Sequence, residues 1–166
     1  DSDPETRSSM WHCDVTDDGA WCILSNSKDT DNKHRYYIAS LDQGVSSRMA
    51  WIPISSQFLF MLDYIANDGT RFYMLTNKDA PNYRIVSFDV DPRAAQTVEH
   101  VCMLTGGIET YQDVVPEDKD GAILTTAAVI DQNKLLAVYS RDVKDELWVF
   151  DLTTGERVTQ IGRAHV

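Results

Sequence analysis

One segment of this chain occurs three times: a turn, a strand-like run, a polar stretch and a second strand-like run that ends in Asp or Ser. The turns are Asp17-Asp18-Gly19, Asn67-Asp68-Gly69 and Asp131-Gln132-Asn133. Asp-Gly is a strong hairpin signal, because tight turns need a positive φ that glycine adopts without steric cost. Long repeats with this strand content are typical of a β-propeller, in which each copy forms one blade.

Each copy has room for four strands. The two long strands of the copies are expected at 20–26 and 35–40, 70–77 and 83–89, and 134–141 and 146–151. A shorter strand is expected before each turn, at 11–15, 62–66 and 127–130, and an outer strand after each pair, at 49–54, 97–101 and 158–161. These runs are rich in Val, Ile, Tyr, Phe and Trp, and helical periodicity is absent. We therefore predict an all-β fragment of a β-propeller: three consecutive four-stranded blades, at about residues 10–56, 57–103 and 122–160.

The charge of the chain limits its partners. A formal net charge of -11 argues against nucleic acid and against anionic membranes, because those surfaces attract an excess of Lys and Arg. No apolar run is long enough to span a bilayer, and no signal peptide is recognisable. The three cysteines lie in or beside apolar runs, which predicts free thiols in a reducing compartment.

Chemical motifs are scarce. No Gly-x-Ser-x-Gly elbow and no phosphate-binding glycine loop occurs, and no metal or cofactor is expected. Four potential zinc ligands are His12, Cys13, Cys22 and His34. Their spacing matches no usual ligand pair, and Cys13 and Cys22 are expected to point inward from strands. The acidic runs 29–31 and 117–120 lack the glycine and glutamate of a calcium loop, so we expect solvated loop tips.

Tryptophan offers a second candidate for binding. The chain has Trp11, Trp21, Trp51 and Trp148. A ligand-stacking set is one interpretation, but aromatic side chains on strands are more often packed in the core between sheets, and we expect that role here.

Several longer motifs resemble the propeller of the prolyl oligopeptidase family. They are Thr76-Asn77-Lys78-Asp79-Ala80-Pro81-Asn82-Tyr83-Arg84-Ile85, Val115-Pro116-Glu117, and the run 141–155 that begins Arg141-Asp142-Val143-Lys144. Residues 3–19 fit the same family, so the resemblance covers almost the whole chain. The Pro-Asn-Tyr-Arg and Asp-Val-Lys-Asp elements are the specific ones.

The resemblance implies a cytoplasmic serine peptidase with a seven-bladed propeller and an α/β-hydrolase domain. Such an enzyme cleaves short peptides after proline with a Ser-His-Asp triad. The triad belongs to the hydrolase domain, so this chain is expected to hold no catalytic residue and to be inactive alone. The implied partners are that hydrolase domain and short proline-containing peptides.

Two residues match pocket positions of the family. Met10 falls where a methionine lines the apolar pocket for the substrate residue two before the cut. The alternative for Met10 is a packed side chain at the end of a strand. Thr30 falls where the animal enzymes have a pocket cysteine, and this difference speaks against a reactive thiol.

Two segments depart from the family pattern. Residues 161–166 resemble the translation of a sequencing adaptor and are expected to interrupt the last outer strand. Residues 101–112 separate His100 from Asp113, which the family pattern joins directly. This segment is expected to be either a retained intron or an exposed loop with Gly106-Gly107 at its tip.

Two other functions stay open. One is the propeller of an oligopeptidase that cleaves after basic residues, although Pro81-Asn82-Tyr83-Arg84 favours the prolyl branch. The other is a non-enzymatic propeller that serves as a protein-binding scaffold. The Trp-Asp and Gly-His signatures of scaffold propellers do not occur in the chain.

Overall fold

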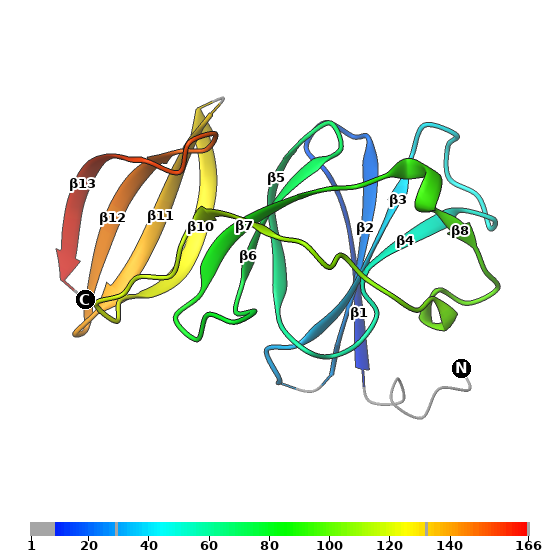
Figure 1. Ribbon diagram of the computed structural model, residues 1–166, viewed down its shortest axis with the longest axis horizontal. Helices are drawn as coiled ribbons and strands as arrows, with labels where there is room; N and C mark the ends of the chain where they lie inside the picture. Colours follow the sequence, from blue (N-terminus) through cyan, green and yellow to red (C-terminus); the bar gives the residue numbers. More distant parts are fainter. Residues whose placement is uncertain (1–8, 29, 132, 166) are drawn as a thin grey trace. The chain divides into compact units, whose positions relative to one another are not determined.

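The computed structural model describes residues 9–28, 30–131 and 133–165. Within these residues the strands form three sheets, with the orders β1-β2-β3-β4-β8, β5-β6-β7-β9 and β10-β11-β12-β13 (Figure 1). The helical segments in this part are short 3₁₀ turns at Pro92–Ala94 and Val101–Met103. The prediction of an all-β fold is therefore confirmed. No helix in the described ranges is long and apolar enough to cross a membrane.

The first sheet is antiparallel and contains β1 (Ser9–Val15), β2 (Trp21–Lys28), β3 (His34–Ser40), β4 (Ala50–Ser55) and the two-residue β8 (Gln96–Thr97). Gly19 has φ of 70° in the first hairpin, which is the conformation that favours glycine. Successive residues of β3 are buried, among them Tyr37, Ile38 and Ala39. Burial on both faces marks β3 as a central strand of this sheet.

The second sheet contains β5 (Leu62–Asp68), β6 (Arg71–Thr76), β7 (Arg84–Asp89) and β9 (Gln112–Val115). Its core is aromatic. The rings of Phe72 and Phe88 stack with centroids 6.0 Å apart, and Tyr111 meets Phe88 edge-on at 5.5 Å. Burial raises the pKa of the Tyr111 hydroxyl to about 12, so it stays protonated at neutral pH.

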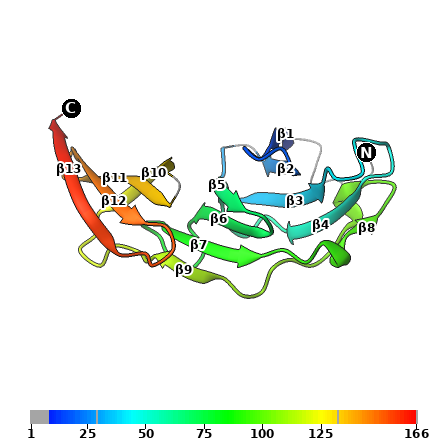
Figure 2. The ribbon, with the colours of Figure 1, turned by 90° about the horizontal axis from the view of Figure 1, so that it is seen from above.

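The third sheet contains β10 (Ile123–Asp131), β11 (Lys134–Arg141), β12 (Lys144–Asp151) and β13 (Arg157–His165), whose consecutive order is visible from above (Figure 2). Buried residues alternate along β11, at Leu135, Ala137 and Tyr139. This period of two is the pattern of a strand with one packed face.

The first two hairpins lie side by side. The Trp21 indole Nε1 donates to the Gly69 carbonyl at 3.0 Å, and the Asn67 amide donates to Asp18 Oδ2 at 2.6 Å. These two bonds hold the Asp17-Asp18-Gly19 and Asn67-Asp68-Gly69 turns next to each other. In the third turn, Gln132 lies outside the described residues.

We predicted an outer strand at Thr97–Val101, and this prediction is wrong. Thr97 belongs to β8 and pairs with Ala50 of β4, whereas Val101 begins a 3₁₀ turn. The outer strand of the second sheet is β9, which pairs with β7. A two-residue strand carries no periodicity of its own, so its place is decided by pairing with a distant segment.

The segment 101–112 is mostly exposed, as expected of a loop, but it is attached to β4 at its centre. Leu104 is buried, Gly107 forms a bridge with Ser55, and the Ile108 amide donates to the Ile54 carbonyl at 3.0 Å. The segment thus continues along β4 beyond the residues that pair with β8. Its origin as an intron or as a loop insertion stays a prediction.

The last strand is longer than we expected. β13 pairs with β12 as far as His165 opposite Lys144, so residues 161–165 do not interrupt it. Backbone hydrogen bonds join strands whatever the side chains are, which lets this sequence occupy an edge. Its resemblance to an adaptor stays a prediction.

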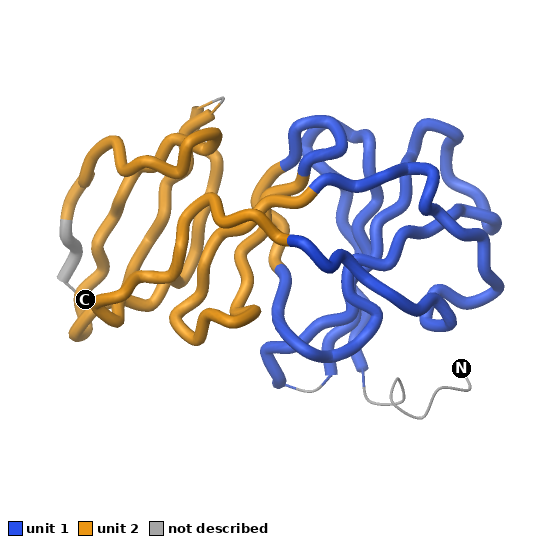
Figure 3. Tube along the Cα trace, in the orientation of Figure 1, with its two compact units in different colours: residues 1–62, 67–71, 89–110 blue, residues 63–66, 72–88, 111–166 orange. Residues whose placement is uncertain are grey.

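The chain divides into two compact units (Figure 3). One consists of residues 1–62, 67–71 and 89–110, and the other of residues 63–66, 72–88 and 111–166. The first unit holds the first sheet together with both Asp-Gly hairpins, and the second holds the third sheet and most of the second sheet.

Candidate substrate-facing site

The two residues that the resemblance assigns to a substrate pocket lie at the same end of the first sheet. Met10 is in β1 opposite Ser27, and Thr30 is in the turn that follows β2. The start of β1 meets the end of β2 because the two strands are antiparallel (Figure 1). Thr30 is exposed, and Met10 is 64% exposed, which is not the exposure of a packed side chain. The pocket roles of both residues stay predictions.

A buried amide holds this end of β1 in place. Asn26 is fully buried, and its Nδ2 donates to Ser9 Oγ at 2.8 Å and to the Met10 carbonyl at 3.3 Å. A buried amide without partners is costly, so these bonds position the backbone that carries Met10. Sequence reasoning missed Asn26. The available signal was a residue type that is depleted in strands, placed inside a strand-like run.

A pocket of about 540 Å³ opens at the end of β2, next to this site. Its lining residues come from three parts of the chain: Lys28, Asp31, Lys33 and Arg35; residues 56–59; and Cys102, Leu104 and Thr105. Arg35 is buried, and its guanidinium carbon lies 4.6 Å from the centroid of the Phe58 ring, a cation–π contact. Met10 and Thr30 do not line the pocket. The sequence did not predict it, because its three segments are distant along the chain.

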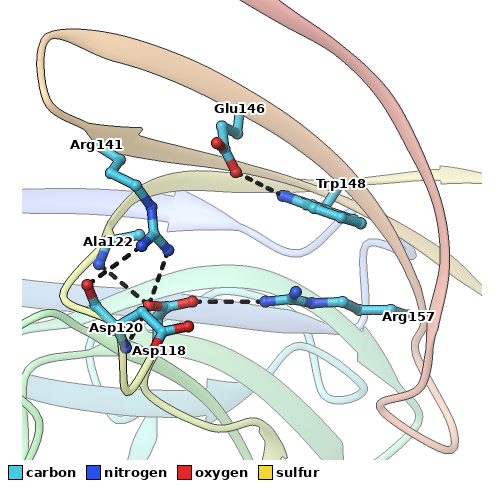
Figure 4. Close-up of polar contacts among 7 residues, drawn as sticks. All are labelled: Asp118, Asp120, Ala122, Arg141, Glu146, Trp148 and Arg157. Atoms are coloured by element: carbon cyan, nitrogen blue, oxygen red, sulfur yellow. Dashed lines mark hydrogen bonds and ion pairs between the residues drawn. The ribbon is translucent and has the colours of Figure 1, made fainter.

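Asp118 is the centre of a charged cluster in the second unit (Figure 4). Its side chain is 8% exposed and accepts from Arg141 Nη2 at 3.1 Å, while Arg157 Nη2 lies 3.5 Å away. The backbone amides of Asp120 and Ala122 donate to it at 2.9 and 3.2 Å. Burial alone would raise the pKa of Asp118, but these amides and the two arginines together bring it below its usual range.

The cluster ties the segment before β10 to the rest of the third sheet. Arg141 also donates from Nη1 to the Asp120 carbonyl at 3.2 Å, and Arg157 lies over the Trp148 ring at 4.5 Å. The expectation of a solvated loop tip at 117–120 is therefore wrong for Asp118. Its partners Arg141 and Arg157 are distant from it in the sequence, so no local sequence pattern predicts these contacts.

Two of the motifs that carried the family resemblance contact each other. Glu117, of the Val-Pro-Glu motif, accepts from the backbone amide of Asn82 at 2.6 Å. Tyr83 adopts φ of 67° in the Pro-Asn-Tyr-Arg loop, and the adjacent Arg84 pairs with Asp113 at 2.8 Å. These motifs therefore have a structural role in the second unit. The Glu117 carboxylate holds the Pro-Asn-Tyr-Arg loop, in which Tyr83 has a left-handed conformation.

The four potential zinc ligands lie on three strands, with His12 and Cys13 on β1, Cys22 on β2 and His34 on β3. No group of three or more His, Cys, Asp or Glu in the described ranges could hold a metal ion. Cys22 is buried as expected, but Cys13 is exposed, so its predicted inward orientation is wrong. The two sulfurs lie 3.5 Å apart. Burial and the neighbouring Cys13 raise the pKa of the Cys22 thiol well above its usual value.

The four tryptophans do not share one role. Trp21 is buried in the first sheet, as predicted for core residues. Trp11 is 39% exposed, with its ring centroid 6.4 Å from that of Tyr37, and Trp51 and Trp148 are half-buried. The core interpretation therefore holds fully for Trp21 alone.

Comparison with known proteins identifies the family. The family model described as the N-terminal β-propeller domain of prolyl oligopeptidase matches residues 2–165. The chain belongs to the prolyl oligopeptidase family. It is part of the propeller domain of a member, and its three sheets correspond to propeller blades, as the sequence predicted.

Relatives in fungi show the extent of this similarity. Prolyl oligopeptidase A of Amanita bisporigera is 32% identical over 99% of the chain, and the dual function macrocyclase-peptidase POPB of Galerina marginata is 27% identical over 92%. The solved structure of prolyl oligopeptidase B from Galerina marginata, bound to a 35mer hydrolysis and macrocyclization substrate, superimposes with a TM-score of 0.80 at 27% identity. It covers 96% of the chain. The chain spans about a fifth of the length of these relatives, 20% for the first.

Proposed function

We propose that the chain is the substrate-gating part of a proline-specific serine endopeptidase. The match to the propeller domain over residues 2–165 carries the proposal, together with the likeness to a relative solved with a long peptide substrate. In this proposal the Ser-His-Asp triad lies in an α/β-hydrolase domain outside the chain, and the propeller admits short peptides and excludes folded proteins. A cytoplasmic location belongs to the same proposal.

The chain would contribute walls and contacts, and no reacting group. Met10 would contact the substrate residue two before the cut, and Asn26 would hold Met10 through its hydrogen bond to the Met10 carbonyl at 3.3 Å. Thr30 would lie beside them with a hydroxyl in place of a thiol. An exposed side chain such as Met10 is free to be covered by an apolar substrate group, which is the contact that this role requires.

The test uses the full-length protein that carries this chain. A peptide with an internal proline and a matched peptide with lysine at that position are incubated with it, and the products are measured by mass spectrometry. We expect cleavage after proline and its loss after treatment with an organophosphate that modifies the active serine. Cleavage after lysine would favour the oligopeptidase for basic residues, and no cleavage of either peptide would favour the scaffold.

Macrocyclisation is a second candidate, because two relatives from Galerina marginata and Amanita bisporigera are named dual function macrocyclase-peptidases. The same experiment separates the two reactions. Transfer of the acyl group to water gives a linear product, whereas transfer to the amino terminus of the same peptide gives a cyclic product lighter by one water.

A further inference from the structure

The pocket at the end of β2 is positively charged in an acidic chain. Among the described residues that line it, Lys28, Lys33 and Arg35 are basic and Asp31 is acidic, whereas the whole chain has a formal net charge of -11. Neither Lys28 nor Lys33 forms an ion pair with a carboxylate of the described residues. Two lysines with no carboxylate partner in the described part of the chain, beside a concave surface, attract an anion to this pocket.

The pocket also has an apolar side. Phe58 lies under the Arg35 guanidinium, Leu104 is buried, and Leu59 is 62% exposed at the wall. A ligand that fills both sides carries an anionic group and an adjoining apolar group. Because Arg35 is the one arginine among the described lining residues, and its guanidinium carbon lies 4.6 Å from the Phe58 ring centroid, the arrangement lacks the cluster of forked donors that favours phosphate.

We propose that this pocket binds a carboxylate of an acidic peptide, with an apolar neighbour of that carboxylate against Phe58 and Leu104. The ammonium groups of Lys28 and Lys33 would meet the carboxylate. Met10 and Thr30 are not part of this site. The proposal goes beyond the peptidase function and does not depend on it, because it concerns binding alone.

One wall of the pocket belongs to the segment 101–112. Cys102, Leu104 and Thr105 supply this wall. The segment is held to β4 at its centre, where the Ser56 amide donates to the Gly106 carbonyl at 3.1 Å and the Gly106 amide donates to Ser56 Oγ at 3.0 Å.

Glycine is required where the segment meets β4. A Cβ atom on Gly107 would lie 2.8 Å from the Ile54 carbonyl oxygen, which real Cβ contacts do not reach. Gly107→Ala should therefore displace the wall formed by Cys102, Leu104 and Thr105. This variant tests the pocket without removing any charge.

Binding is measured by calorimetry on the full-length protein with short peptides that lack proline, so that cleavage does not interfere. The first peptide is acetyl-Ala-Glu-Phe-Ala-amide, and the second has Gln in place of Glu. A third is the Gln peptide with a free terminal carboxylate, which distinguishes a side-chain from a terminal source. We expect the Glu peptide to bind about fivefold more tightly than the Gln peptide, and this difference to shrink as salt is added.

The variant Lys28→Gln/Lys33→Gln should abolish the difference between the Glu and Gln peptides. The control Lys119→Gln/Lys144→Gln removes the same charge from exposed positions of the second unit and should keep the difference. Gly107→Ala should weaken binding of the Glu peptide. Equal binding of both peptides to the unaltered protein, or a difference that survives in Lys28→Gln/Lys33→Gln, would overturn the proposal. Activity on proline peptides is measured in a separate assay. A failure of the proposed peptidase function is thereby distinguished from a failure of the proposed carboxylate binding.

Discussion

At the scale of single residues, Asp118 shows how one carboxylate organises a sheet edge. It accepts hydrogen bonds from its own loop, through the amides of Asp120 and Ala122, and from Arg141 at the end of β11. Its side chain is nearly buried, whereas those of Arg141 and Arg157 are a third and half exposed, at 33% and 49%. The arginines therefore keep much of their hydration. Loss of partners would destabilise the fold more at the Asp118 carboxylate than at either arginine.

Asp118→Asn should destabilise the propeller by about 1–3 kcal/mol at neutral pH, because one buried oxygen loses its charged partners. The lowered pKa of Asp118 means that its stabilisation is present above the pKa of an unfolded Asp, about 3.9, and is lost as the pH falls through the lower folded value. The difference in free energy of unfolding between the unaltered protein and Asp118→Asn should therefore become smaller below about pH 4. Urea midpoints at several pH values measure this. Asp120→Asn, whose exposed side chain makes none of these contacts, is the control, and an equal loss for both variants would contradict the role of Asp118.

Met10→Ala should lower kcat/KM for substrates with a large apolar residue immediately before proline and spare those with glycine there. The lost contact is worth about 1–3 kcal/mol, or roughly 5- to 150-fold. The measurement compares two fluorogenic peptides on the full-length protein. Met103→Ala is a matched control, since Met103 is 63% exposed and Met10 is 64% exposed. An equal loss for both peptides would rule out a role in this pocket.

At the scale of elements, the turn between β11 and β12 departs from the residues that its geometry prefers. Asp142 and Val143 have φ of 48° and 62°, and they separate the paired residues Arg141 and Lys144. Two central residues with positive φ form the turn type that Asn-Gly favours. Val143 is β-branched and 80% exposed, so its side chain gains little packing to offset the strain.

Val143→Gly should therefore stabilise the protein by about 1 kcal/mol, because it removes the steric cost of the left-handed conformation. A rise in the urea midpoint with an unchanged slope would show this gain. Val45→Gly is the control: Val45 is 82% exposed and has no positive φ, so glycine there adds only chain entropy to the unfolded state. A fall in stability for Val143→Gly would mean that the valine side chain makes contacts that outweigh its strain.

The elements that sequence predicted well are those defined by local chemistry. The Asp-Gly hairpins and the long strands β2, β3, β6 and β11 follow from turn residues and strand composition. The failures have non-local causes: β8 exists because it pairs with β4, and Leu104 is buried because residues 106–108 bond to that same strand. For the same reason the motifs of the candidate site could be named from resemblance, whereas Asn26, the Asp118 cluster and the cationic pocket could not.

At the scale of the whole molecule, the exposed apolar side chains gather on particular strands. Met10, Trp11 and Val15 are exposed on β1, Ile123 and Ile130 on β10, and Val158 and Ile161 on β13. Large apolar surface of this kind marks a place where another element packs. In a repeat architecture each unit is stabilised by its neighbours, and the relatives are about five times as long as this chain, which covers 20% of the first of them.

The chain expressed alone should therefore be marginally folded, prone to association and inactive as a peptidase. Each Å² of apolar surface that stays exposed to water removes roughly 25 cal/mol from the free energy of folding. A missing blade interface therefore lowers the stability by several kcal/mol, which is comparable with the roughly 5–15 kcal/mol stability of a typical domain. The β13 edge adds unpaired backbone groups that invite pairing between copies, and the net charge of -11 opposes that association without replacing the lost contacts. Sedimentation, thermal melting and a proline-peptide assay on residues 1–166 and on the full-length protein test this expectation. A monomer with a sharp melt would contradict the stability argument, because it would show that three blades suffice for a cooperative core. Reproducible cleavage after proline by the short chain would contradict the assignment of catalysis to a separate domain.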